Sequence, residues 1–220
     1  TRVDRSSALT GSSANSTRGR AIRARAMAMR CRWPPEKAGG RRARGQETQR
    51  SDTALGVLGM GNRFDFEGGD RLAKAARAIV PRIETLRARF DAAGAPTIYV
   101  NDNFSHWQGQ FGDLVAACRD AGGASASIVQ RLAPRPHDYH VLKPKHSGFL
   151  ATPLAILLAQ PGARRLVLTG LSADSCVLAT AQGAHMREYA VWGPQDAVAA
   201  ITPARRRQAL QVMAVGRGRR

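Results

Sequence analysis

From Thr53 onward, short apolar runs alternate with longer segments in which apolar residues recur every three or four positions. The clearest periodic segment runs from Asp70 to Gly94, and its spacing predicts a helix with one buried face. Asp70 has the residue type of an N-cap, Gly94 that of a C-terminal stop, and Pro81 predicts a kink or a restart between them. The apolar positions of this face are Leu72, Ala76, Ile79, Ile83, Leu86 and Phe90.

The short apolar runs predict strands over residues 54–58, 96–102, 139–143, 164–170 and 188–193. Further helices are expected over 112–120, 152–162, 174–186 and 202–213, and the Gly- and Ser-rich stretch 122–127 predicts a loop. This alternation predicts an α/β protein with a mostly parallel, doubly wound sheet covered on both faces. In such sheets the reactive residues gather beyond the carboxyl ends of the strands, here near Gly59, Lys143 and Cys176.

The net charge of +18 is concentrated at the two ends of the chain. Residues 1–50 hold twelve Arg and one Lys against three acidic residues, and residues 216–220 add three Arg. We therefore expect a basic, disordered or loosely packed extension over 1–50, a folded domain over 51–215 and a basic tail over 216–220. The first segment is also poor in acidic residues and rich in Arg and Ser, as organelle transit peptides are.

Basic ends bind polyanions weakly and in a salt-dependent way, and the chain has no zinc-finger spacing or aromatic-rich RNA-binding motif. We therefore expect no specific nucleic-acid partner. No apolar run approaches the roughly 20 residues that a membrane span needs, which predicts no membrane partner. The beginning of the chain has no apolar stretch of the signal-peptide type, so the expected location is the cytoplasm.

Cys176 follows the expected strand 164–170 and lies near the start of the next helix. Unpaired N–H groups and the helix dipole at such a position stabilise a thiolate, which can then act as a nucleophile. The alternative is that Cys176 is a small buried core residue, as many free cysteines are. Lys143 ends another strand and could stabilise the same thiolate, or it could be an ordinary solvated lysine.

Neither a metal nor an organic cofactor is expected. The three cysteines lack a CxxC spacing, and the five histidines show no ligand spacing. Gly59 and Gly61 follow a strand as in a dinucleotide fingerprint, but Phe64 replaces the third glycine.

Three motifs carry a resemblance to a known family. "TGLSADSCV" resembles the cysteine signature of the isochorismatase-like cysteine hydrolases, "LKPKHSGF" their lysine motif, and "TALGVLGMGNRFDFEGGD" their opening strand. The motifs stand in the family's order, and the resemblance covers residues 52–214. It implies a three-layer α/β/α sandwich, a homo-oligomer, a small-molecule amide-like substrate and no cofactor.

The resemblance also implies roles for individual residues. Cys176 would attack an amide or carbamoyl carbon to form a thioester, with Lys143 as its electrostatic partner. The N–H groups of Ala173 and Cys176 would form the oxyanion hole. The substrate-binding positions would be Asn103, Phe104, Trp107 and Ser172. From the residues alone, Phe104, Trp107 and Phe111 could equally form a hydrophobic cluster beneath a loop.

The sequence departs from the family at the acid that moves protons. Gly59 stands in its place, Arg63 replaces a second acid, and Asp65 lies six residues past Gly59, at another motif position. Loss of a general acid/base typically costs about 10²–10⁴ in rate, so the predicted amidohydrolase is impaired. The alternative is a catalytically dead member that binds a small molecule or serves assembly. Gly59→Asp is expected to separate the two, because it should raise activity sharply if the rest of the site is intact.

The metal-dependent nicotinamidases of this family place an Asp and a His after their second strand. Asp102 matches the acid, but Phe104 occupies the place of the first His and His106 is out of step. This departure again predicts no bound metal.

Overall fold

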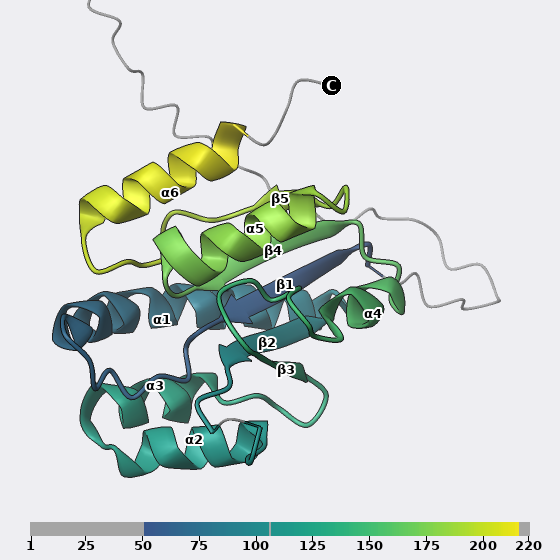
Figure 1. Cartoon of the computed structure of the whole chain (residues 1–220). Helices are drawn as coiled ribbons and strands as arrows, with labels where there is room; N and C mark the ends of the chain where they lie inside the picture. The colour runs from purple at the N-terminus through teal and green to yellow at the C-terminus, as the bar shows by residue number, and fades with distance from the viewer. Residues whose placement is uncertain (1–50, 106, 216–220) are drawn as a thin grey trace, which may run out of the picture. The chain divides into compact units, whose positions relative to one another are not determined.

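The computed structural model describes residues 51–105 and 107–215, so the expectations for the basic extension and the basic tail lie outside the described residues. Five strands form one parallel sheet in the order β3-β2-β1-β4-β5 (Figure 1). The strands are β1 (Thr53–Leu58), β2 (Thr97–Asp102), β3 (Tyr139–Lys143), β4 (Arg165–Gly170) and β5 (Ala190–Trp192).

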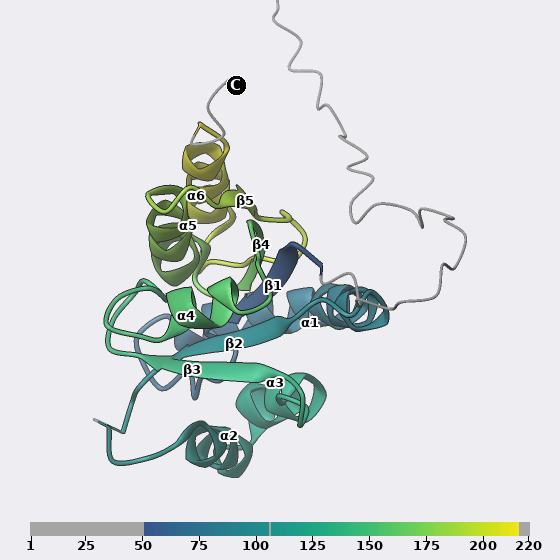
Figure 2. The ribbon, with the colours of Figure 1, turned by 90° about the vertical axis from the view of Figure 1, so that its right-hand side faces the viewer.

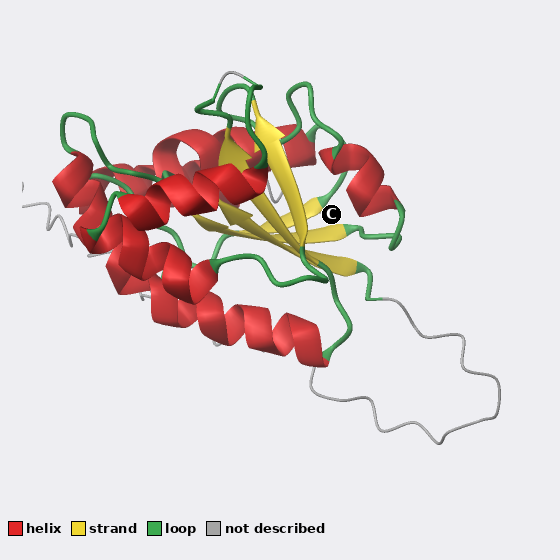
Figure 3. Cartoon of the chain, turned by 90° about the horizontal axis from the view of Figure 1, so that it is seen from below, coloured by secondary structure: helices red, strands yellow, loops and turns green. Residues whose placement is uncertain are grey.

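Helices cover both faces of this sheet, which confirms the expected three-layer α/β/α arrangement (Figures 2 and 3). The helices α1 (Gly69–Ala92) and α3 (Gly123–Leu132) lie on one side, and α4 (Leu154–Ala159) and α5 (Leu178–His185) lie on the other (Figure 2). The helix α2 (Phe111–Asp120) packs on α3, and α6 (Pro203–Val215) packs on α5. No described helix is long and apolar enough to cross a membrane.

The strands direct alternate side chains to the two outer layers, as the pleat of a strand requires. Leu58, Val100 and Leu168 share a buried cluster with Leu158 of α4 and Ala181 of α5. The opposite face of the sheet packs on α1, whose buried residues are Gly69, Leu72, Ala73, Ala76, Ile79, Val80, Ile83, Leu86 and Phe90. The face expected from the spacing of apolar residues in this helix is therefore its buried face.

The structure corrects three local predictions. Residues 123–127 begin α3 rather than form a loop, because Ile128 and Leu132 are buried and the Ser125 hydroxyl donates to the Asn62 carbonyl. Pro81 lies inside an uninterrupted α1. Asp70 lies in the first turn of α1, after an N-cap at Gly68, so its carboxylate faces the positive end of the helix dipole instead of capping it.

Gly170 is the last residue of β4 and lies against the end of β1. Its φ is +100°, and a Cβ at this position would lie 2.0 Å from the Leu58 carbonyl oxygen. The next amide, that of Leu171, donates to the same Leu58 carbonyl at 2.8 Å. Glycine is therefore required where the chain leaves the sheet and enters the turn that carries Cys176.

We predict that Gly170→Ala lowers the free energy of unfolding by more than about 4 kcal/mol, because the methyl group adds a backbone overlap to a positive φ. Gly94→Ala is the matched control, since Gly94 has a φ of +63° but nothing within 4 Å of its added Cβ. It should lose only about 1–2 kcal/mol. Urea unfolding of both variants measures the difference; equal losses would show that Gly170 is not sterically constrained.

Candidate active site

The candidate site lies at the carboxyl ends of the parallel strands. Asp102 and Lys143 are the last residues of β2 and β3, and the parallel register pairs them directly. Cys176 lies in a π-helical turn, η1 (Ala173–Val177), between β4 and α5. The expected helix 174–186 is therefore a π-helical turn followed by an α-helix. π-turns of this kind are frequent at functional sites.

Lys143 joins the other two side chains. It is completely buried, and its ammonium group donates to Asp102 Oδ1 and, at 3.3 Å, to Cys176 Sγ. Cys176 Sγ also lies 3.8 Å from Asp102 Oδ2. The three groups thus form a closed set of contacts. This burial excludes the alternative of a solvated lysine at position 143.

Cys176 is partly buried against the hydrophobic cluster and partly exposed, so the residue is not fully enclosed. Ser175 adds a further polar contact, since its hydroxyl lies 4.0 Å from Cys176 Sγ and 3.0 Å from His146 Nδ1. Sequence reasoning gave no role to Ser175 or His146. Both residues stand inside motifs that it had singled out, which was the signal available.

The backbone at Gly59 excludes a simple restoration of the missing acid. The φ of Gly59 is +62°, and a Cβ there would lie 2.7 Å from the Leu171 carbonyl oxygen. An aspartate at this position would strain the backbone, so Gly59→Asp would not cleanly test for lost chemistry, contrary to the expectation from sequence. Asp65 does not replace the acid, because it pairs with Arg63 at 3.2 Å and both side chains are largely exposed.

Asp102 is the carboxylate that the structure brings to the thiol. Sequence reasoning had considered it only as a possible metal ligand. The missing signal was the strand register: Asp102 and Lys143 are the terminal residues of neighbouring parallel strands, and parallel neighbours end at the same edge.

The turn before Cys176 departs from the predicted oxyanion hole. The Ala173 N–H donates to the Ala199 carbonyl at 2.7 Å and Ala173 is completely buried, which argues against a role in binding an oxyanion. The Ser172 hydroxyl donates to Asp174, and Asp174 pairs with Arg205 of α6 at 3.1 Å. Ser172 therefore helps to fix the turn; the role of the Cys176 N–H stays a prediction.

The predicted substrate-binding loop follows Asp102. The Asn103 N–H donates to the Lys143 carbonyl at 2.9 Å, and Asn103 Oδ1 accepts the Trp107 N–H at 3.2 Å. Asn103 Nδ2 is buried without a hydrogen-bond partner among the described residues. Phe104 and Trp107 are 55% and 60% exposed, so neither lies in a hydrophobic cluster beneath the loop. Phe111 does not line the site, because it is buried against Tyr99 and His140.

Within residues 51–105 and 107–215, no group of three or more His, Cys, Asp and Glu side chains is arranged to hold a metal ion. His106 lies outside the described residues. The absence of a metal therefore stays a prediction.

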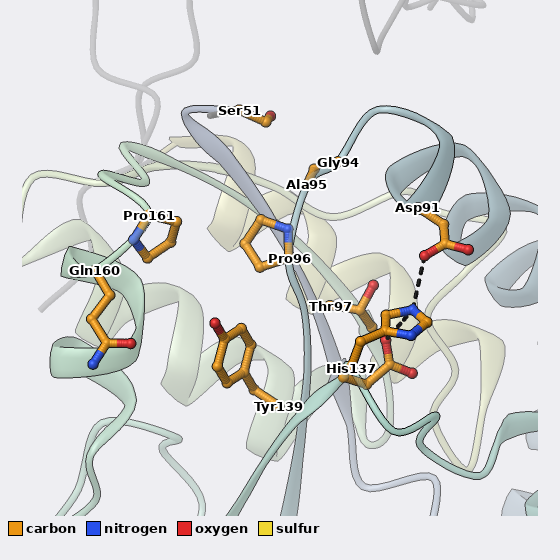
Figure 4. A pocket seen from close by; sticks show the side chains of 11 residues that line it. Ser51, Asp91, Gly94, Ala95, Pro96, Thr97, His137, Tyr139, Gln160 and Pro161 are labelled. Carbon is orange, nitrogen blue, oxygen red and sulfur yellow. Dashed lines mark hydrogen bonds and ion pairs between the residues drawn. The ribbon is translucent and has the colours of Figure 1, made fainter. Parts of the chain in front are cut away.

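A separate cavity of about 370 Å³ lies at the other end of the strands, beside their amino ends (Figure 4). Its lining includes Thr97 and Tyr139, the first residues of β2 and β3. His137 Nε2 contacts Asp91 Oδ1 at 2.9 Å beside it. The cavity is thus separated from Cys176 by the length of the strands and is not part of the candidate active site.

The fold and these contacts define an α/β/α protein with a cysteine–lysine–aspartate site at the carboxyl edge of a parallel sheet. A family model described as the Isochorismatase domain matches residues 53–218, and the chain belongs to this family.

Three similar proteins support this assignment. The uncharacterized isochorismatase family protein YaaI of Bacillus subtilis is 37% identical over 150 residues, which cover 68% of this chain and 82% of that protein. The ureidoacrylate amidohydrolase RutB of Stutzerimonas stutzeri is 29% identical over 164 residues, 63% of this chain and 66% of that protein. The crystal structure of N-carbamoylsarcosine amidase from Thermoplasma acidophilum matches with a TM-score of 0.55 and 28% identity, over 74% of this chain and 92% of that chain.

We predict that iodoacetamide modifies Cys176 at least about tenfold faster than Cys118 in the folded protein at pH 7. Burial raises the pKa of the Cys118 thiol, so less of it is thiolate at a given pH, and its side chain is fully inaccessible. Site-resolved mass spectrometry measures both rates. In urea the two rates should converge, and equal rates in the native protein would contradict the difference between the two environments.

Proposed function

We propose that this protein is a cysteine-dependent hydrolase of an amide or carbamoyl C–N bond in a small molecule. The observation that carries the proposal is the contact between the buried Lys143 ammonium and Cys176 Sγ. An adjacent positive charge favours the thiolate, which is the nucleophilic form of cysteine. The names of two relatives, an amidohydrolase of ureidoacrylate and an amidase of N-carbamoylsarcosine, support the bond type.

The reaction proceeds in two steps. Cys176 Sγ attacks the carbonyl carbon, the C–N bond breaks, and the amine leaves with one proton while a thioester forms. Water then attacks the thioester, the C–S bond breaks, and the acid product and the free thiol are released. Both steps pass through an oxyanion, and hydrogen-bond donors aimed at that oxygen typically contribute about 10²–10³ in rate.

One donor for the substrate oxygen in this proposal is the Cys176 N–H at the first turn after β4, as the family resemblance implies. Asn103, the residue after Asp102, stays a predicted substrate-binding residue. The exposed rings of Phe104 and Trp107 would then cover a small planar group beside it.

We further propose that hydrolysis is slow compared with members that keep the acid of the central strand, because Gly59 has no side chain to move a proton. The protein would need no organic cofactor and no metal, would act on a small molecule in the cytoplasm, and would form a homo-oligomer as the family resemblance implies. Gly59 also favours the second candidate, a member without activity that binds a small molecule or serves assembly.

The test is ammonia release from a panel of simple amides and N-carbamoyl amino acids. We expect turnover below about 1 s⁻¹ by the wild-type protein and a further loss of at least about 10³-fold in Cys176→Ser, because the nucleophile is removed. Cys118→Ala, which removes the other described cysteine, should keep the wild-type rate.

Three outcomes separate the candidates. Turnover that survives Cys176→Ser would contradict the cysteine mechanism. Turnover above about 1 s⁻¹ would contradict the impairment. A wild-type rate equal to that of Cys176→Ser on every compound, with the compounds still binding in calorimetry, would favour the inactive member.

A further inference from the structure

We propose that Asp102 is the catalytic acid/base of this protein and replaces the acid that is absent at Gly59. This inference rests on the proposed cysteine hydrolase function. It assigns the proton transfers to a residue on β2, next to the central strand. The protein would then be an enzyme whose acid has moved to another strand, rather than an inactive member of the family.

The two oxygens of Asp102 have different partners. Oδ1 accepts from the Lys143 ammonium, and Oδ2 lies 3.8 Å from Cys176 Sγ. The first contact fixes the carboxylate, and the second turns its free oxygen toward the reacting sulfur. The Asp102 side chain is 28% exposed, whereas Lys143 is completely buried, so water and a leaving amine can reach the carboxylate.

The other candidate acids and bases contact groups other than the thiol. Asp174 contacts Ser172 and Arg205 rather than Cys176, and Asp65 pairs with Arg63 at the surface. His146 contacts Ser175 and not the thiol. Within the described residues, Asp102 is the one carboxylate with a contact to Cys176 Sγ.

The alternation of side chains along β2 places Asp102 on the face of the sheet that carries the Cys176 turn. Side chains alternate along β2, and Val100 belongs to the buried cluster that also contains Ala173 and Val177 of the Cys176 turn. Asp102 therefore projects to the same side as that turn. The intervening Asn101 faces the other side, where its amide accepts from the Gly61 N–H at 3.0 Å and donates to the Gly61 carbonyl at 2.7 Å.

These contacts also attach the segment that follows β1 to the end of β2. The Gly59 N–H donates to the Val100 carbonyl at 2.9 Å, and Asn101 holds Gly61 on both sides. Gly59, which follows the central strand, has no side chain to offer Lys143. Asp102 is then the acid that the strand ends bring to the lysine and the thiol.

Asp102 would carry one proton in each step. Its carboxylate accepts the thiol proton as Sγ bonds to the carbonyl carbon, and it gives that proton to the nitrogen as the C–N bond breaks. In the second step it accepts a proton from the attacking water and returns it to the sulfur as the C–S bond breaks. Lys143 keeps its proton throughout and balances the charge of the carboxylate and the thiolate.

The test uses 4-nitrophenyl acetate with Asp102→Asn, because 4-nitrophenolate leaves without needing a proton. Acylation of Cys176 should therefore slow less than deacylation, because it loses the base for the thiol but needs no acid for the leaving group, and one equivalent of nitrophenolate should still be released before turnover stalls. Deacylation still needs a base for water, so the steady-state rate should fall by about 10²–10⁴-fold, and the acetyl group should accumulate on Cys176 in intact-mass spectra. Asp65→Asn, which removes an exposed carboxylate after β1, is the matched control and should behave as wild type.

A burst followed by a wild-type steady-state rate in Asp102→Asn would overturn the role of Asp102 and leave the proposed function intact. A Cys176→Ser variant that releases nitrophenolate at the wild-type rate would overturn the proposed function itself. A charge-retaining variant, Asp102→Glu, should keep deacylation within about tenfold of wild type, since a base of the same kind remains; a loss as large as that of Asp102→Asn would contradict a proton-transfer role.

If Asp102→Asn does not fold because it leaves Lys143 buried and unpaired, the comparison moves to Lys143→Met against Lys143→Met/Asp102→Asn. Removing both members of a buried ion pair is often tolerated. The double variant, acetylated to completion, should then deacylate at least about tenfold more slowly than the single variant. Equal rates would overturn the inference.

Discussion

The structure depends on a buried ammonium group. Lys143 has no exposed surface, and a charge taken out of water is costly unless it is paired and hydrogen-bonded. Asp102 and Cys176 supply its partners from two different places in the chain. The Lys143 ammonium is paired only when β2 and β3 lie in their parallel register and the turn after β4 has formed. The need to pair this one charge therefore links the ends of three strands.

Two glycines set how closely the ends of β1 and β4 approach each other. Gly170 lets the chain leave β4 against the Leu58 carbonyl, and Gly59 lets the chain leave β1 against the Leu171 carbonyl. Each position has a positive φ and no room for a Cβ. The backbone at position 59 therefore requires glycine, and the chemistry of the site has to be explained without an acid at that position.

Much of the fold follows from the sequence. The period of the apolar residues identified α1 and its buried face, and the β-branched and apolar runs identified the five strands. Residues 122–127 were mispredicted because Gly and Ser favour loops in isolation, whereas in the protein the burial of Ile128 and Leu132 stabilises a helix. The proximity of Cys176 and Lys143 was predicted from their positions after strands and from the family motifs.

The contacts of the site could not be predicted in the same way. Asp102 needed the β2–β3 register, which places it beside Lys143, and the sequence does not show that register. The amide of Ala173 pairs with Ala199, a residue 26 positions away in the printed sequence, so only the tertiary structure reveals that it is occupied. The unpartnered Asn103 Nδ2 is likewise a property of packing around the loop.

The measurement that tests this account most directly is the rate of Cys176 alkylation by iodoacetamide at pH 7 in Lys143→Met, compared with wild type. The account predicts a loss of at least about tenfold, because the thiolate would lose its positive neighbour and keep the Asp102 carboxylate. Thermal unfolding of the variant shows whether the fold is retained. An unchanged alkylation rate in a folded variant would show that Lys143 does not govern the thiol, and the central contact of the site would have no chemical role.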